Sequence, residues 1–116
     1  MRFLCLYRPG TLESDRPPTE QEQATMGKLI GEMAAAGVLL AVEGCRPSSY
    51  GMRVSIDGGT FTVTDGPFPE TKELIAGFCM LQTKTKAEAV EWCKRFLSVV
   101  GEGQSEIRLL HDMPAA

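Results

Sequence analysis

The amino-acid sequence predicts an α+β domain with a ferredoxin-like arrangement, a β-α-β repeat with an antiparallel sheet and an inserted β-hairpin. Two segments carry the same helix-start signal, and short apolar runs flank both of them. Between the two β-α-β units, apolar and polar residues alternate around a glycine turn. Both helices of such a fold pack on one face of the sheet, so we expect a second subunit to cover the other face.

The first β-α-β unit begins at the N-terminus. Residues 3–7 place apolar side chains on both faces of the expected strand, which is typical of a central strand. Thr19 and Glu22 have the capping-box spacing and predict a helix that ends near Ala36, where a glycine follows. The inward stripe of this helix should consist of Met26, Leu29, Ile30 and Met33. The apolar run 38–42 then predicts a buried strand.

The middle of the chain has the pattern of a hairpin followed by a further strand. Residues 52–56 and 60–64 alternate apolar and polar side chains on either side of the turn 57–59, which predicts a β-hairpin. Residues 75–81 indicate another strand, in which Gly77 marks a bulge or the close approach of another backbone.

The second unit repeats the signals of the first. Thr85 and Glu88 again have the capping-box spacing, and their helix should end at Gly101. Its inward stripe should consist of Val90, Cys93, Leu97 and Val100. Alternation around Ile107 and Leu109 predicts the last strand.

Size and composition indicate a single domain at residues 1–112, followed by a loose tail at 113–116. An apolar fraction of 43% with 23% charged residues excludes a disordered chain. The net charge of -3 provides no cationic field, so we expect no nucleic-acid partner. No apolar run is long enough for a membrane span or a signal peptide, so we expect no membrane association and a cytoplasmic location.

The residues that most often bind metals or catalyse reactions are sparse in this sequence. Cys5, Cys45, Cys79 and Cys93 lie far apart in apolar segments and form no CxxC pair, so we expect four reduced thiols in the core and no metal site. His111, the one histidine, follows the last strand and should lie in a surface tail. No glycine-rich phosphate loop or GxSxG motif is present, and we expect no cofactor.

The densest group of unusual residues is Asp65-Gly66-Pro67-Phe68, followed by a second proline. The prolines restrict the backbone and Asp65 can accept N–H bonds across the turn, which predicts a rigid corner. In one interpretation, Asp65 caps the turn and Phe68 fills the core. In the other, the corner and the charged residues 70–73 line a cleft.

Glu43 is the second candidate, because it interrupts an apolar strand. It either reaches water at the strand end or pairs with a cation, for which the candidates are Arg46, Arg53, Lys72 and Arg108. We predict Asp65 and Glu43 as the acid and base residues of a cleft near Asp65. The expected substrate-binding residues are Lys72, Arg108, Phe68, Glu70 and Arg53.

Several stretches together resemble the DGPF branch of the YCII-related family: residues 35–40, Glu43-Gly44, residues 64–73 and Gly77-Phe78. The resemblance covers nearly the whole chain, and residues 63–73 are its most specific part. It implies a ferredoxin-like subunit that pairs sheet to sheet, as in dimeric α/β-barrel proteins. It also implies a cleft lined partly by the loop that contains Asp65.

The resemblance implies two roles. A dehydrochlorinase-like enzyme branch of the family relies on a histidine and aspartate pair, whereas this chain has no histidine in its first helix or early strands, so enzyme activity stays open. Members of the DGPF branch are often encoded beside extracytoplasmic-function sigma factors. We therefore expect a homodimer that binds a small polar organic molecule, with lyase-like acid/base chemistry, or alternatively a regulatory interaction module for such a sigma factor.

Overall fold

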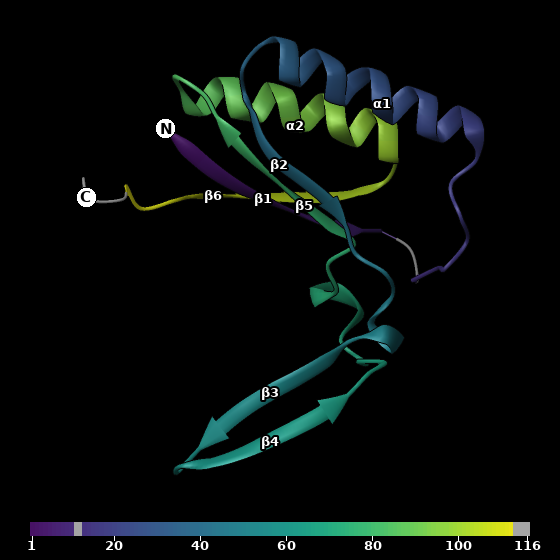
Figure 1. The fold of residues 1–116 in the computed structure, drawn as a ribbon, viewed down its shortest axis with the longest axis vertical. Helices are drawn as coiled ribbons and strands as arrows, with labels where there is room; N and C mark the ends of the chain where they lie inside the picture. The colour runs from purple at the N-terminus through teal and green to yellow at the C-terminus, as the bar shows by residue number, and fades with distance from the viewer. Residues whose placement is uncertain (11–12, 113–116) are drawn as a thin grey trace.

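The computed structural model describes residues 1–10 and 13–112 and confirms the α+β, ferredoxin-like class. The predicted tail at 113–116 lies outside these residues. In chain order the elements are β1 (Arg2–Pro9), α1 (Glu20–Ala35), β2 (Leu39–Gly44), the 3-10 turn η1 (Ser48–Tyr50), β3 (Met52–Asp57), β4 (Thr60–Asp65), the 3-10 turn η2 (Thr71–Glu73), β5 (Gly77–Gln82), α2 (Lys86–Val100) and β6 (Gly103–Leu109). Both helices lie side by side on one face of a sheet, and the β3–β4 hairpin extends away from this body (Figure 1).

The main sheet is antiparallel and has the strand order β2-β5-β1-β6, which places β1 in a central position as expected. Toward the helices, its side chains form the core with residues of α1 and α2. The buried core consists of Phe3, Cys5, Leu29, Met33, Val38, Cys79, Leu81, Ala89 and Cys93. On the opposite face, the register places Leu4 beside Met80 and Leu6 beside Phe78, and all four are half-buried. These four residues are called the open face below.

Both predicted N-cap threonines cap their helices. The Thr19 hydroxyl accepts a hydrogen bond from the Glu22 amide at 3.1 Å, and the Thr85 hydroxyl accepts one from the Glu88 amide at 3.2 Å. The stripe predicted for α2 is wrong at Val90, which is 39% exposed, whereas its neighbour Ala89 is fully buried. A step of one residue turns a helix by about 100°. A stripe centred on Cys93 therefore includes Ala89, four positions earlier, and leaves Val90 outside it.

The β3–β4 hairpin, called the arm below, is exposed along its whole length. Its register places Val54 opposite Val63 and Ile56 opposite Phe61, so these side chains share one face. The polar residues between them occupy the other face, as in a strand pair that covers a core on one side. Within the described part of the chain, however, neither arm strand packs substantially on any element but its partner.

The end of one predicted strand differs from the structure. β2 continues through Glu43 and Gly44, because backbone pairing with β5 persists while the carboxylate points into solvent. The predicted close approach at Gly77 is confirmed, since a Cβ atom there would lie 2.9 Å from the Glu43 carbonyl oxygen. Cys45, which follows β2, is exposed, so the expectation that all four cysteines lie in the core is wrong for this residue. Neither helix in the described residues is long and apolar enough to cross a membrane.

Candidate functional site

The corner at residues 65–68 is fixed by backbone contacts that require glycine at position 66. The Gly66 amide donates to the Gly51 carbonyl at 3.0 Å, and the Gly66-Pro67 peptide bond is cis. A Cβ atom at Gly66 would lie 1.8 Å from the Ser48 carbonyl oxygen, far inside any van der Waals contact. Only glycine allows the two backbones to approach this closely.

Ser48 joins the corner to a third segment. Its hydroxyl accepts a hydrogen bond from the Phe68 amide at 3.1 Å and donates one to Glu13 Oε2 at 2.7 Å. The Ser48 amide donates to Glu13 Oε1, also at 2.7 Å. The expected capping by Asp65 is wrong, because its exposed carboxylate makes no hydrogen bond within the described residues and Ser48 binds the corner amide instead. The loop before α1, η1 and the corner thus meet at one serine.

Three of the predicted substrate-binding residues come together at the base of the arm. The guanidinium carbon of Arg53 lies 3.9 Å from the centre of the Phe68 ring, and Arg53 Nη1 donates to Glu70 Oε2 at 3.1 Å. A cation over an aromatic face contributes about 0.5–1 kcal/mol at an exposed site. Because Arg53 belongs to β3, these contacts tie the arm to the corner.

A second arginine cluster lies on the other side of η1. The Tyr50 hydroxyl donates to Asp15 Oδ2 at 2.7 Å, and Arg46 Nη2 donates to the same oxygen at 3.2 Å. The guanidinium carbon of Arg46 lies 3.8 Å from the centre of the Tyr50 ring. The hydrogen bond from Tyr50, with the charge of Arg46, holds the pKa of Asp15 below its usual value.

Between these clusters lies a cleft made of two adjoining hollows of about 230 and 200 Å³. Glu13, Arg46, Leu74 and Ile75 line both hollows, and we call the whole the Glu13–Arg46 cleft. The larger hollow also contains Tyr7 and Cys45, and the smaller one contains Ser48, Arg53, Phe68 and Glu73. The combined size suits a small organic molecule, and two arginines and two carboxylates line the cleft together with apolar side chains.

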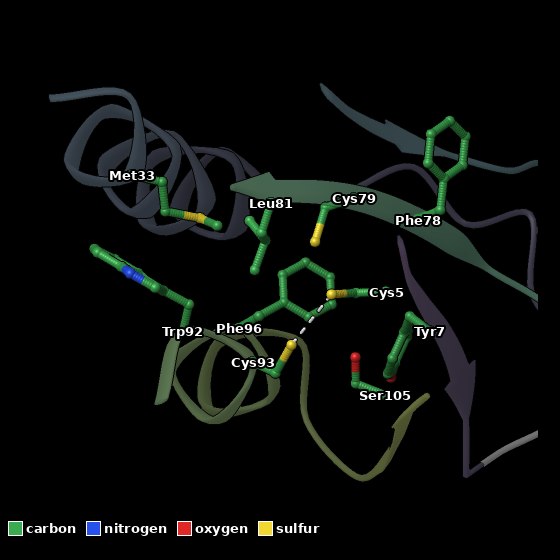
Figure 2. Close-up of a pocket in the computed structure, with 10 residues that line it drawn as sticks. All are labelled: Cys5, Tyr7, Met33, Phe78, Cys79, Leu81, Trp92, Cys93, Phe96 and Ser105. Carbon is green, nitrogen blue, oxygen red and sulfur yellow. Dashed lines mark hydrogen bonds between the residues drawn. The ribbon is translucent and has the colours of Figure 1, made fainter. Parts of the chain in front are cut away.

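A crevice in the core has a different character. It contains Cys5, Cys79 and Cys93 among aromatic and aliphatic side chains, and Cys5 Sγ lies 3.5 Å from Cys93 Sγ (Figure 2). Its volume is about 10 Å³, at most the room for one water molecule. Hydrogen bonds with Cys79 and Cys93, together with burial, raise the pKa of Cys5 above its ordinary value. This crevice is therefore part of the core and too small for a ligand.

The remaining predicted site residues lie outside the Glu13–Arg46 cleft. Asp65 is exposed on the apolar face of the arm, opposite Met52. Glu43 is exposed beside Phe78 of the open face and forms no ion pair within the described residues. Lys72 is exposed in η2, and Arg108 is exposed on β6, where it pairs with Glu106 at 3.1 Å.

Sequence reasoning missed Glu13, Ser48, Asp15 and Tyr50 as members of the site. Arg46 was considered only as a partner for Glu43, yet it binds Asp15. The available signal was weak: Glu13 and Asp15 lie in a polar loop, and Arg46-Pro47-Ser48 follows the end of a buried strand. No periodic pattern links two loops that are more than thirty residues apart.

A family model gives the chain its classification. The model of the YCII-related domain matches residues 1–113. The chain belongs to the YCII-related family. The match confirms the family resemblance of the sequence, while membership of the DGPF branch stays a prediction. No curated protein matches the chain.

Proposed function

We propose that this YCII-related protein is a homodimer that binds a small polar organic molecule in the Glu13–Arg46 cleft, next to the corner that contains Asp65. The observation that carries the proposal is the convergence of four loop segments on two hollows with a shared wall. A molecule with an acid group and an apolar part suits this lining. Arg46 would bind the acid group, and Leu74 and Ile75 would contact the apolar part.

Glu13 is the residue best placed for lyase-like acid/base chemistry in the cleft. Ser48 donates two hydrogen bonds to its carboxylate, and no cation pairs with it within the described residues. Such a carboxylate is held in one orientation and can accept a proton from a bound molecule. Asp65 and Glu43, the predicted acid and base, stay proposals whose side chains lie outside the cleft.

A panel of small carboxylic acids, followed by protein NMR, tests the cleft directly. We expect shifts at the amides of Arg46, Ser48 and residues 74–76, and a loss of binding in the variant Arg46→Gln. Arg16→Gln is the matched control, because Arg16 is also an exposed loop arginine paired with a carboxylate, but it does not line the cleft. Equal binding by both variants, or shifts confined to other regions, would contradict the proposed site.

The arm supports a second candidate function, an interaction module for a regulator such as an extracytoplasmic-function sigma factor. Exposed apolar patches commonly mark protein interaction sites. Here five arm side chains are between 62% and 70% exposed: Met52, Val54, Ile56, Phe61 and Val63. In this case the purified chain alone would be monomeric, and adding the sigma factor would protect the arm from proteolysis. A homodimer whose arm is already protected would contradict this candidate.

A further inference from the structure

We infer that the arm is a dimerisation device whose apolar face covers the open face of a second copy of the chain. This inference rests on the homodimer proposed above and adds to it the surfaces that meet. It concerns the five exposed arm side chains, Met52, Val54, Ile56, Phe61 and Val63, and the open face formed by Leu4, Leu6, Phe78 and Met80.

The shape of the chain indicates an extensive partner surface. Its radius of gyration is 16.2 Å, whereas a compact chain of this length has a radius of about 13 Å. Its accessible surface is 8400 Å², whereas a compact monomer of 12.6 kDa exposes roughly 6200 Å². The excess is about 2200 Å² per chain, which is the scale of an obligate homodimer interface.

The apolar face of the arm is not covered by the described residues of its own chain. A two-stranded hairpin alone is marginal in water, because a single layer cannot remove its apolar face from solvent. The arm has that construction, with Val54 beside Val63 and Ile56 beside Phe61 on one face. Because no described element packs on this face, we expect its cover to come from a partner.

The corner prevents the arm from folding back onto its own sheet. The arm leaves the body near the ends of β2 and β5 and points away from the sheet (Figure 1). Arg53 is bound to Phe68 and Glu70, and the Gly66 and Phe68 amides are bound to η1 and its flank. These contacts fix the direction of the arm, so its apolar face and the open face of the same chain stay apart.

A second copy of the chain would cover the apolar face of the arm and the open face at once. Under a twofold axis, the arm of each chain lies on the open face of the other, and one contact type is used twice. The arm is long enough to cross the main sheet. Its six-residue strands are roughly 20 Å long, and the four strands of the sheet span roughly 14 Å between the outer strand axes. A foreign partner of the arm alone would leave the open face uncovered.

Cross-linking between differently labelled chains tests which surfaces meet. In a Cys45→Ser background, which removes the exposed thiol, one chain carries Val54→Cys and the other carries Met80→Cys. We expect a covalent dimer on mild oxidation, or with a short thiol-specific cross-linker where the geometry is less favourable. The matched control is Ser55→Cys with Met80→Cys, because Ser55 is the next residue of β3 and lies on the opposite face of the arm.

Sedimentation velocity measures the dimer dissociation constant of the variants as a second test. Val63→Lys should raise the dimer dissociation constant at least roughly 30-fold, as expected when a central interface residue is lost, while Thr62→Lys should leave it within about threefold. Circular dichroism of the helices checks that both variants fold, and Val54→Lys serves as a second position.

The possible outcomes distinguish the role of the arm from the homodimer on which it rests. A wild-type monomer would overturn both the homodimer and the role of the arm. A dimer in which arm cysteines link only to arm cysteines, or sheet cysteines only to sheet cysteines, would overturn the inference and leave the homodimer standing. A monomer that gains arm protection only with a sigma factor would favour the regulator. Ligand binding in the cleft is tested separately by the NMR titration above, so a failure of that titration alone would contradict the cleft and leave the role of the arm standing.

Discussion

Replacing Gly66 by alanine should open the corner, because the new methyl group would lie 1.8 Å from the Ser48 carbonyl oxygen. Ordinary contacts begin near 3.4 Å, so one of the two backbones must move by about 1.6 Å. The contact atom is backbone and cannot rotate away. Moreover, Ser48 is held by two hydrogen bonds to Glu13 at 2.7 Å, so the displacement cannot be absorbed by η1 without cost.

Three hydrogen bonds depend on the position of these backbones. They are the bonds from Gly66 N–H to the Gly51 carbonyl, from Gly51 N–H to the Ser48 carbonyl and from Phe68 N–H to the Ser48 hydroxyl. Each contributes a net 0.5–1.5 kcal/mol, so the free energy of opening the corner should fall by about 2–4 kcal/mol. Since a local opening need not unfold the main sheet, the melting transition of the whole domain is the less sensitive measurement.

Amide hydrogen exchange measured by NMR reports the corner directly. The amides of Gly51, Gly66 and Phe68 should exchange roughly 30- to 800-fold faster in Gly66→Ala, which is the rate equivalent of that free energy. The matched control is Gly31→Ala in α1, where a Cβ atom meets nothing within 4 Å. That variant should stabilise the protein by about 0.5–1 kcal/mol, because alanine favours the helix. Corner amides that keep their wild-type exchange rates in Gly66→Ala would refute the close contact.

Three further predictions concern the core, the caps and the loop before α1. Leu81→Ala should lower the unfolding free energy in urea by about 2–5 kcal/mol because Leu81 is 0% exposed, whereas Val90→Ala at 39% exposed should cost under about 1 kcal/mol. Thr85→Ala should cost about 0.5–2 kcal/mol in the same assay through the lost helix cap, and an unchanged midpoint would contradict the bond to Glu88. Tyr50→Phe should raise the pKa of Asp15 toward its ordinary value in a carbon-13 NMR titration. The pKa of Asp15 is lower in the folded state than in the unfolded state. The stabilisation from Asp15 is therefore present above its unfolded pKa and is lost as the pH falls through the folded pKa. Tyr50→Phe should make this pH-dependent loss of stability smaller.

The sequence predicted the elements well where the signal is local. Thr19 and Thr85 start their helices because a cap and the residue three positions later are adjacent in the chain. The hairpin around residues 57–59 likewise follows from neighbouring residues. The errors lie where packing decides, as at Val90, whose exposure depends on the rotation of α2 against the sheet.

The candidate site was predicted only in part, for the same physical reason. Arg53, Phe68 and Glu70 were predicted to bind substrate; the structure brings them together beside the corner, and their role in binding stays a prediction. The bonds from Ser48 to Glu13 join residues 35 positions apart in segments without regular structure. No periodicity constrains such a contact, so only the folded chain reveals it.

The same corner serves both the cleft and the arm, and this links the two proposals physically. Phe68 lines the cleft on one side and supports Arg53 on the other, and Arg53 is both a residue of the arm and part of the cleft wall. If a second copy holds the arm in place, it also holds Arg53 and thereby fixes the shape of the smaller hollow. Ligand binding and dimerisation should then be coupled, and by thermodynamic reciprocity each should strengthen the other by the same factor. Asp65-Gly66-Pro67-Phe68 would thus act as a joint, with Gly66 and Phe68 as its essential residues, while the Asp65 carboxylate makes no hydrogen bond within the described residues.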